Sequence, residues 1–457
     1  MSFPHEIFKA YDIRGIVDKT LTEDITFKIG QSVGSEVIAS GGTSIIIGRD
    51  GRLSGPALSE KLAKGLQASG VNVIDIGVAP SPVVYYSSYS LNVPSCIAIT
   101  GSHNPPDYNG FKMVVDGTTL SAEKIQTVKQ RIVDNDYSQG EGSYRQHDII
   151  DDYVARIVAD IKPRRQLKIV IDCGNGVAGA TAPQVFNQLD CEVIELFSEV
   201  DGTFPNHHPD PSQLENLQDL IKSVADNNAD LGLAFDGDGD RLGIVTPRGE
   251  VIWPDRQMIL FARDVLDRNP GAEIIYDVKC SRNLPAEIER AGGKATMGRT
   301  GHSFIKAKLK ETGAALAGEM SGHIFFKERW FGFDDGVYAG ARLIELLAKQ
   351  SLSPQAVFDT LPDSINTPEL RVEFSEGEHY VFMEKLKAIA KFDDAIVSTI
   401  DGIRVDFIDG FGLVRPSNTT PILVLRFESD NESGLKRIQT AFADVMKQVE
   451  PDIVLPF

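Results

Sequence analysis

The sequence predicts an α/β protein with mixed, largely parallel sheets, followed by a C-terminal region of the α+β type. Two observations predict the α/β part: short apolar runs recur along the chain, and each ends at a glycine or turn residue before a helical pattern. A third observation predicts the last region. After about residue 363, strand-like stretches are joined by polar turns and followed by a final helix.

The expected strands and helices follow from periodicity. The segment 56–69 is typical of the helices between strands, because its apolar residues Leu58, Leu62, Ala63 and Leu66 fall on one helical face, which should pack on a sheet. The apolar runs that predict buried strands are 44–48, 71–77, 95–100, 168–173, 230–235 and 274–278. In the last region we expect strands at 369–374, 402–407 and 421–428 and a helix at 435–449.

The chain has 457 residues, which at roughly 150 residues per domain predicts about three domains. The polar stretch 134–147 is rich in turn-forming residues and places a first boundary just after it. Further changes of pattern place boundaries near residues 250 and 362. The predicted segments are 1–148, 149–250, 251–362 and 363–457.

Composition excludes several classes of protein. With 42% hydrophobic and 24% charged residues, the chain is neither disordered nor collagen-like. The 46 Lys and Arg against 65 Asp and Glu give a formal charge of −19, which predicts no nucleic-acid or membrane partner. Glu6 and Asp12 interrupt the N-terminus where a secretory signal needs an apolar run, so we expect a cytoplasmic protein. The four cysteines form no CxxC pair and are interpreted as buried thiols.

The most informative segment is ADLGLAFDGDGDRLGIVT, at 229–246. An apolar strand leads into a tight loop that holds Asp236, Asp238 and Asp240, separated only by glycines. Three carboxylates this close repel one another, and a hard divalent cation is the simplest remedy. An EF-hand is excluded because its sixth and twelfth positions would be Arg241 and Pro247. The pattern favours Mg²⁺, with a charged surface turn as the alternative.

A second segment, IAITGSHNPPDYNGFK at 97–112, places Ser102 in a loop after an apolar strand. That position suits a nucleophilic hydroxyl at the open end of a parallel sheet. The neighbours His103 and Lys112 offer a proton carrier or a positive charge. The alternative is a turn whose Ser and Asn only cap backbone groups.

A third group offers cations and hydrogen-bond donors for phosphate or sugar. Arg14 in YDIRG, Lys279 and the run RPSNTT at 415–420 suit phosphate oxygens, although the run alone is more often a polar turn. The loops at 298–306 and 318–323 each follow an apolar stretch. In the second of them Glu319, Ser321 and His323 suit sugar hydroxyls, with an ordinary acidic turn as the alternative.

Taken together, four of these segments resemble the signature loops of the α-D-phosphohexomutase family. TGSHNP, DGDGDR, GEMSGH and RPSNT occur in the family's order and span essentially the whole chain. YDIRG, TGSHNPPDYNGFK and GEMSGH are most similar to the bacterial phosphomannomutase/phosphoglucomutase branch. One departure is Gly101, where many family members have Ala; it leaves the serine and its neighbours intact.

The resemblance implies a heart-shaped monomer of four domains, three related α/β domains and a mobile C-terminal one. One loop from each domain would meet in a central cleft. It also implies roles for individual residues. Ser102 would be the phosphoserine and, with Asp236, Asp238 and Asp240, a ligand of Mg²⁺. The other implied catalytic residues are Arg14, His103, Lys112 and Arg241. The implied substrate-binding residues are Tyr11, Lys279, His302, Glu319, Met320, Ser321, Gly322, His323, Arg415, Pro416, Ser417, Asn418 and Thr419.

The predicted reaction starts from phosphorylated Ser102, which gives its phosphoryl group to a hexose 6-phosphate. The resulting hexose 1,6-bisphosphate turns over and returns the other phosphate, leaving the hexose 1-phosphate. Lys112 or a histidine would accept the hydroxyl proton. Glucose 1,6-bisphosphate or mannose 1,6-bisphosphate would serve as activator and intermediate. The sequence does not indicate which pathway uses the product; in the family that it resembles, the usual destination is nucleotide-sugar synthesis.

Three alternatives remain open at this stage. The first is a phosphoglucosamine mutase, because the preferred sugar cannot be read from a loop. The second is a sugar phosphatase of the haloacid dehalogenase type with Asp236 as nucleophile, disfavoured because Asp240 stands where that class usually carries Thr or Val. The third is a metal-stabilised protein that only binds sugar phosphates.

Overall fold

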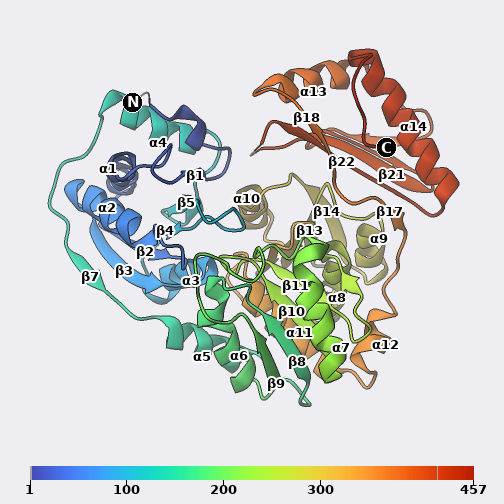
Figure 1. Cartoon of the computed structure of the whole chain (residues 1–457), viewed down its shortest axis with the longest axis horizontal. Coiled ribbons are helices and arrows are strands. Elements are labelled where there is room, and N and C mark those ends of the chain that lie inside the picture. Colours follow the sequence, from blue (N-terminus) through green and yellow to red (C-terminus); the bar gives the residue numbers. More distant parts are fainter. Residues whose placement is uncertain (1–2, 419) are drawn as a thin grey trace.

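The computed structural model describes residues 3–418 and 420–457, which form four sheets in succession along the chain (Figure 1). Thr419, one of the predicted phosphate contacts, lies outside the described residues. Chain length predicted about three domains, which is fewer than the four sheets of the structure. Within the described residues, no helix is both long and apolar enough to cross a membrane.

The first sheet has seven strands in the order β1-β5-β4-β2-β3-β7, with β6 paired to β5. Strands β4, β2, β3 and β7 are parallel, whereas β5 is antiparallel to both β4 and β1. The strands are β1 (Ile13–Ile16), β2 (Ser44–Arg49), β3 (Asn72–Val78), β4 (Cys96–Ile99), β5 (Tyr108–Val115), β6 (Thr118–Thr119) and β7 (Tyr144–Gln146). The helices are α1 (Glu23–Ala39), α2 (Gly55–Ala68), α3 (Ser81–Ser90) and α4 (Glu123–Asp134).

Helices cover both faces of this sheet, which explains its continuous apolar strands. Ile45 and Ile47 of β2 pack in one core with α1, α2 and α4, and Ile46 packs on the other face with α3. The predicted helix at 56–69 is α2. Its four apolar residues are all buried in that first core.

The second sheet has the order β12-β11-β10-β8-β9, with β10, β8 and β9 parallel and β11 and β12 antiparallel. Its strands are β8 (Lys168–Asp172), β9 (Glu192–Leu196), β10 (Leu231–Phe235), β11 (Leu242–Val245) and β12 (Val251–Ile252). Its helices are α5 (Ile150–Asp160), α6 (Ala182–Gln188) and α7 (Gln218–Asn227). Leu220 and Val224 place α7 on one face, while Val185 and Phe186 place α6 on the other.

The third sheet has the order β14-β13-β15-β16, in which only β16 is antiparallel. Its strands are β13 (Glu273–Asp277), β14 (Lys294–Gly298), β15 (Leu316–Gly318) and β16 (Ile324–Phe326). The helices of this region are α8 (Pro254–Arg268), α9 (Asn283–Arg290), α10 (His302–Thr312), α11 (Gly336–Lys349) and α12 (Pro354–Phe358).

These three sheets share one topology, which supports the prediction of three related α/β domains. In each, the first of four consecutive strands is central, the second is parallel on one side of it, and the third is parallel on its other side. The fourth strand then pairs antiparallel with the third. The corresponding quartets are β2–β5, β8–β11 and β13–β16. A loop between the third and fourth strands therefore occupies the same position in all three domains.

The fourth sheet is entirely antiparallel and matches the predicted α+β region. Its order is β17-β22-β21-β20-β19, with β18 also on β22. Its strands are β17 (Ile365–Asn366), β18 (Leu370–Glu373), β19 (Ile396–Ser398), β20 (Ile403–Phe407), β21 (Gly410–Pro416) and β22 (Ile422–Ser429). Its helices are α13 (Glu378–Ile389) and α14 (Glu432–Val449).

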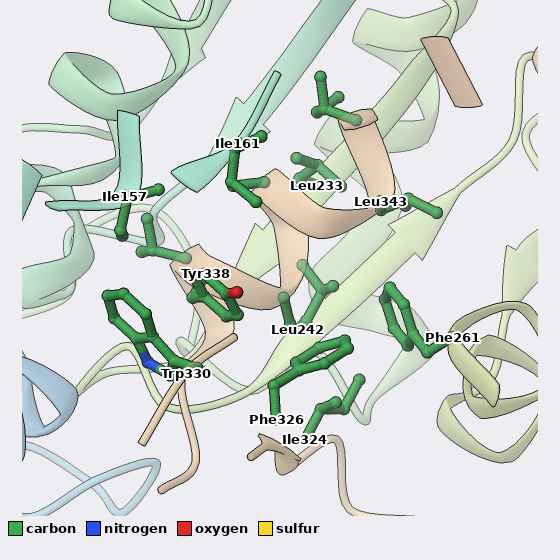
Figure 2. Packing of buried hydrophobic residues seen from close by; sticks show 14 of the residues in the cluster. Ile157, Ile161, Leu233, Leu242, Phe261, Ile324, Phe326, Trp330, Tyr338 and Leu343 are labelled. Carbon is green, nitrogen blue, oxygen red and sulfur yellow. The ribbon is translucent and has the colours of Figure 1, made fainter. Parts of the chain in front are cut away.

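One hydrophobic core joins the first three domains. It contains residues of α3 and β4, of β8 and β10, and of β13 and β15. Helix α11 lies at its centre, where Tyr338 stacks on Trp330 at 4.1 Å and Leu343 lies near Leu233 and Leu242 of the second sheet (Figure 2). The last domain has a separate core, built from α13, α14 and its own strands. In Figure 1 this domain stands apart at the upper right.

The α/β prediction is confirmed, and the six predicted apolar runs are β2, β3, β4, β8, β10 and β13. The predicted strands and final helix of the last region are β18, β20, β22 and α14. Strand β5 was not predicted, since Asn109, Gly110 and Lys112 interrupt its apolar pattern although all three are buried. The domain boundaries at 148, 250 and 362 stay a prediction.

Candidate active site

The three aspartates of the DGDGD loop lie side by side after β10. Asp236, Asp238 and Asp240 are fully buried and each offers a carboxylate oxygen within 4.8 Å of the others. Gly239 has φ +77°, a left-handed conformation that glycine adopts without strain and that turns the loop back on itself. The backbone N–H groups of Asp240 and Arg241 each donate to Asp236 Oδ1 at 3.1 Å.

The charges of this cluster are incompletely balanced. Burial and the carboxylates of Asp240 and Asp238 raise the pKa of Asp236 well above its ordinary value. Asp238 Oδ1 is buried and has no hydrogen-bond partner among the described residues. Oxygen donors with excess negative charge are the ligands that hard divalent cations prefer. The residues present therefore fit a metal site.

Ser102 lies directly beside this cluster, in the loop that follows β4. Its Oγ is 3.4 Å from Asp236 Oδ2 and 3.1 Å from His103 Nδ1. The residue is buried and has φ +50°, which is a strained conformation for a residue with a side chain. Burial, and then the cations of Arg241 and Arg14, lower the pKa of His103 well below its ordinary value, so this ring is neutral.

Lys112 crosses from β5 to the aspartates. Its Nζ is 2.7 Å from Asp238 Oδ2 and 2.5 Å from Asp240 Oδ2. Burial disfavours the ammonium form, but these two carboxylates outweigh it and raise the pKa of Lys112. Lys112 is therefore charged, and it partly neutralises the cluster as it stands.

The GEMSGH turn between β15 and β16 brings the third domain to the same point. His323 Nε2 is 3.2 Å from Asp240 Oδ1, and its Nδ1 is 2.9 Å from Ser321 Oγ and 3.3 Å from Glu319 Oε2. Burial favours the neutral ring, but Asp240 and Glu319 raise the pKa of His323 to about 9. Gly322, at φ +102°, accepts a backbone hydrogen bond from Leu242 N at 3.2 Å, which ties this turn to the aspartate loop.

Two residues of the N-terminal segment reach the site from the first domain, Tyr11 beside His302 and Arg14 beside the serine loop. The Tyr11 ring meets His302 edge-on at 5.3 Å, and His302 in turn stacks with His323 at 5.8 Å. Arg14 donates to Asp12 at 2.5 Å and also to Asn104 of the serine loop.

His302, at the start of α10, differs from the other histidines. Both of its ring nitrogens are buried without a hydrogen-bond partner among the described residues. Burial, followed by the cations of Lys306 and Lys112, lowers the pKa of His302 well below its ordinary value. It is therefore a neutral imidazole with a free acceptor.

The fourth domain contributes cations from its side of the site. Arg415, near the end of β21, is buried and donates from Nε to Asp401 Oδ2 at 2.9 Å, while its Nη2 has no partner among the described residues. Lys279 of the third domain is 2.6 Å from Glu369. After Pro416, Ser417 Oγ lies 3.0 Å from Thr420 Oγ1, and Asn418 is half-buried.

Comparison with known proteins gives the chain its relatives. Models of four domains of phosphoglucomutase/phosphomannomutase match in order: alpha/beta/alpha domain I at residues 5–139, domain II at 151–249, domain III at 253–364 and the C-terminal domain at 369–445. The chain belongs to this family.

Individual relatives agree with the family models over the full length. A phosphomannomutase/phosphoglucomutase of Pseudomonas aeruginosa is 53% identical over 456 residues, which cover 100% of this chain and 98% of that protein. A phosphoglucomutase of Neisseria gonorrhoeae is also 53% identical, over 460 residues, covering 100% and 99% of the two chains. A crystal structure of a family protein from Burkholderia thailandensis superposes with a TM-score of 0.95 at 55% identity and covers 99% of both chains.

For this family member, the structure brings most of the predicted site residues into contact with one another. Ser102, Asp236 and Asp240 link the first two domains, and His323 adds the third. The backbone N–H of Met320 donates to Asp277 Oδ1 at 3.1 Å. Met320 therefore contributes to the turn through its backbone. The 415–418 segment lies at the end of β21 and in the turn after it, where Arg415 pairs with Asp401 of the same domain.

Several residues of the site were missed by sequence reasoning. Ser81, the first residue of α3, donates to Asp238 Oδ2 at 2.5 Å, and Asp334 lies 3.1 Å from Lys306 and 3.8 Å from His302. Ser81 lies where a strand leads into a helix, which is a signal for ligand contact at the edge of a parallel sheet. Asp334 had no such signal, because its neighbours come from other elements.

Proposed function

We propose that the chain is a phosphomannomutase/phosphoglucomutase, which interconverts hexose 6-phosphate and hexose 1-phosphate through a phosphoserine and a hexose 1,6-bisphosphate. The observation that carries the proposal is the position of the Ser102 hydroxyl, 3.4 Å from Asp236 at the edge of a buried carboxylate cluster. The full-length relatives named above support the choice of mannose and glucose phosphates.

In the forward half-reaction, the phosphorus atom bound to Ser102 Oγ forms a bond to the free sugar hydroxyl oxygen, and its bond to Oγ breaks. The sugar hydroxyl loses a proton in that step, and in the return step Ser102 takes the phosphoryl group at the other end of the sugar. Such a transfer depends on positioning and on electrostatic stabilisation of the phosphoryl oxygens. The strained, buried loop of Ser102 provides the positioning.

Asp236, Asp238 and Asp240, together with an oxygen on Ser102, would hold Mg²⁺. When bound, this ion neutralises charge on the transferring phosphoryl group. Lys112 adds a fixed positive charge beside Asp238 and Asp240. Arg14 contacts Asn104 of the serine loop, and Arg241 Nε lies 3.7 Å from Asp236 Oδ2, so both extend the positive field around the phosphate.

A neutral histidine accepts the hydroxyl proton in this proposal. His302 is neutral and its ring nitrogens are without partners among the described residues, so it is available as a base. Lys112 was the other residue suggested by the sequence. Its paired ammonium group has no lone pair to offer, so the proposal gives it an electrostatic role.

The sugar and its second phosphate are held by the third and fourth domains. Glu319, Ser321 and His323 hold sugar hydroxyls, with Met320 and Gly322 shaping the turn between them. Arg415, Ser417 and Asn418, with Pro416 and Thr419 in the same segment and Lys279 opposite, bind the phosphate that is not transferred. Because this set binds phosphate only, it accepts either end of the bisphosphate.

Glucose 1,6-bisphosphate or mannose 1,6-bisphosphate would prime the serine as activator. A location in the cytoplasm, action as a monomer and the lack of nucleic-acid or membrane partners stay predictions of the sequence, as do the domain boundaries. Phosphoglucosamine remains the alternative sugar. Hydrolysis through Asp236 loses support, because the four family models belong to a mutase family.

The test is ³¹P NMR of the protein with Mg²⁺ and a trace of glucose 1,6-bisphosphate. Mannose 1-phosphate, glucose 1-phosphate and glucosamine 1-phosphate are supplied in separate samples. We expect conversion of the first two to the 6-phosphates, loss of that conversion in Ser102→Ala, and full conversion by Ser143→Ala, an exposed serine of the same domain. Release of inorganic phosphate alone would reject the mutase.

A further inference from the structure

Arg52 is one of the largest fully buried side chains among the described residues, and the proposed reaction gives it no role. It follows β2 and lies beneath the loop that carries Ser102. The second domain covers it from outside: the Phe204 ring is 5.2 Å from its guanidinium carbon, and a Cβ on Gly202 would lie 2.5 Å from its Cα. A buried arginine this size needs a partner for every donor.

Each of the five guanidinium N–H groups of Arg52 has an acceptor. Nε donates to the carboxylate of Asp50 at 3.1 Å. The two terminal nitrogens donate to three backbone carbonyls of the serine loop, Ser102 at 2.8 Å, Asn104 at 2.7 Å and Pro105 at 2.5 Å, and to that of Tyr108, the first residue of β5, at 3.0 Å. One side chain therefore holds most of the loop between β4 and β5.

Asp50 holds the beginning of the same loop. Its Oδ2 accepts from Thr100 Oγ1 at 2.8 Å and from Gly101 N at 3.1 Å, and Thr100 Oγ1 accepts from Ser102 N at 2.7 Å. The Asp50–Arg52 pair thus reaches the loop on both sides of Ser102. A left-handed φ at a non-glycine residue persists only where its surroundings determine it, and these bonds determine it.

Gly101 is part of the same arrangement. A Cβ at this position would lie 2.3 Å from the Arg52 guanidinium carbon and 2.4 Å from Nε. Real Cβ contacts of that length do not occur, so an alanine at 101 requires Arg52 to move. Because five hydrogen bonds fix Arg52, it cannot move without releasing the loop.

We propose that Arg52 is a positioning residue for phosphoryl transfer, which holds Ser102 in its strained turn facing Asp236, and that Gly101 is its required partner. The inference rests on the proposed function, which it deepens. Arg52 touches no reacting atom, since its contacts are carbonyls, Asp50 and Phe204. Its loss should therefore affect the transfer step while binding of the sugar phosphate is retained.

The experiment compares Arg52→Lys with Arg342→Lys. Arg342 is an equally buried arginine of α11, with Nη2 2.9 Å from Glu328 and 3.1 Å from Asp264, far from the serine loop in sequence and topology. We measure kcat, KM and the single-turnover rate of phosphoryl transfer from Ser102, all per folded molecule. Arg52→Lys should lower kcat and the transfer rate at least about 10-fold, the scale of a misplaced group, with KM nearly unchanged. Arg342→Lys should leave both rates as in the wild type.

Two further measurements complete the test. Gly101→Ala should reproduce the loss, and the double variant Gly101→Ala/Arg52→Lys should lose less than the product of the single losses, because both changes release one contact. Amide hydrogen exchange across residues 100–108 should rise in Arg52→Lys and not in Arg342→Lys.

The inference would be overturned if Arg52→Lys kept a normal kcat or changed only KM. It would also be overturned if the loss in the double variant equalled the product of the two single losses. Hydrogen exchange is independent of activity. If the wild type converted none of the sugars, the proposed function would fail, and unchanged exchange at 100–108 in Arg52→Lys would separately refute the role of Arg52 in holding the loop.

Discussion

The first three domains and the fourth present their loops to the site in different ways. In the first three, the loops with Ser102, Asp236 and Glu319 each join the third, parallel strand to the antiparallel fourth. In the fourth domain, the loop after Arg415 is a hairpin between antiparallel β21 and β22. One topology, used three times, places the serine, the aspartates and the GEMSGH turn at equivalent sheet edges.

The hydrophobic cores also set the first three domains apart from the fourth. The first three domains share one hydrophobic core around α11 (Figure 2), whereas the fourth has its own. Its junction with the third domain is mainly polar: Arg404 donates to the Val278 and Cys280 carbonyls at 2.7 Å, and Ser281 donates to Glu428 at 2.9 Å. The apolar cluster at this junction is small, made of Val278, Phe411 and Leu413.

The difference separates two tasks. A shared core fixes the transferring groups relative to one another, as phosphoryl transfer requires. A polar junction can be remade with little loss of buried apolar area, so we propose that the fourth domain closes over a bound phosphate and excludes water.

The largest effect is expected at the fixed aspartates. Asp238→Asn removes a charge from the carboxylate cluster while keeping its shape, and we expect turnover to fall about 10³-fold or more, as for loss of electrostatic stabilisation. Apparent Mg²⁺ affinity in the kinetic assay should fall with it. The control is Asp226→Asn, an exposed residue of α7 paired with Lys222. Equal activity of the two variants would contradict the assignment of the cluster.

The next effect separates the two cores. Leu343→Ala in the shared core and Met446→Ala in the last domain each remove a fully buried side chain, at a cost of about 2–5 kcal/mol. Calorimetry should show that Leu343→Ala lowers the unfolding temperature of the three joined domains. Met446→Ala should lower the unfolding temperature of the last domain. A single transition that both variants shift equally would show that the division is wrong.

A smaller effect is expected at the phosphate site. Arg415→Lys keeps the charge but loses the guanidinium fork, so KM for mannose 1-phosphate should rise about 10-fold. The rate of transfer from Ser102 should change much less, because the fixed part is intact. Arg437→Lys, an exposed arginine of the same domain paired with Asp409, is the control. A loss of kcat with unchanged KM would place Arg415 in the transfer step.

The smallest effect concerns the junction. Burial raises the pKa of Glu369, but Lys279 beside it outweighs burial and lowers it to about 2 from its ordinary 4.5. The pair therefore stabilises the fold above pH 4.5, and that contribution is lost as the pH falls towards 2. Because Glu369 is about a third exposed, we expect Glu369→Gln to cost no more than about 1 kcal/mol at neutral pH.

Urea unfolding of the wild type and Glu369→Gln across this acid range measures that contribution. The difference in free energy of unfolding should disappear towards the acid end, and Glu376→Gln, an exposed glutamate of the same domain, should show no such trend. If the difference in free energy of unfolding did not change with pH, the Lys279–Glu369 pair would not be its source.

Local sequence was sufficient for much of the fold and for the residues of the four loops. Buried parallel strands such as β10 are apolar throughout, and the aspartates follow directly, so strand and motif were both visible. Strand β5 was hidden, because Lys112 is buried there by partners that come from the second domain. Ser81 was missed for the same reason, because its partner Asp238 belongs to the second domain. Asp334 and Arg52 were missed because their partners come from other elements of their own domains, which no local pattern records.

The most direct test of the central claim is to identify the residue that carries phosphate. The protein is incubated with Mg²⁺ and glucose 1,6-bisphosphate, digested, and mapped by mass spectrometry before and after hydroxylamine treatment. We predict one phosphoryl group on Ser102, stable to hydroxylamine and discharged by mannose 6-phosphate with formation of the bisphosphate. A hydroxylamine-labile phosphate on Asp236, or no phosphate on the protein, would contradict the account.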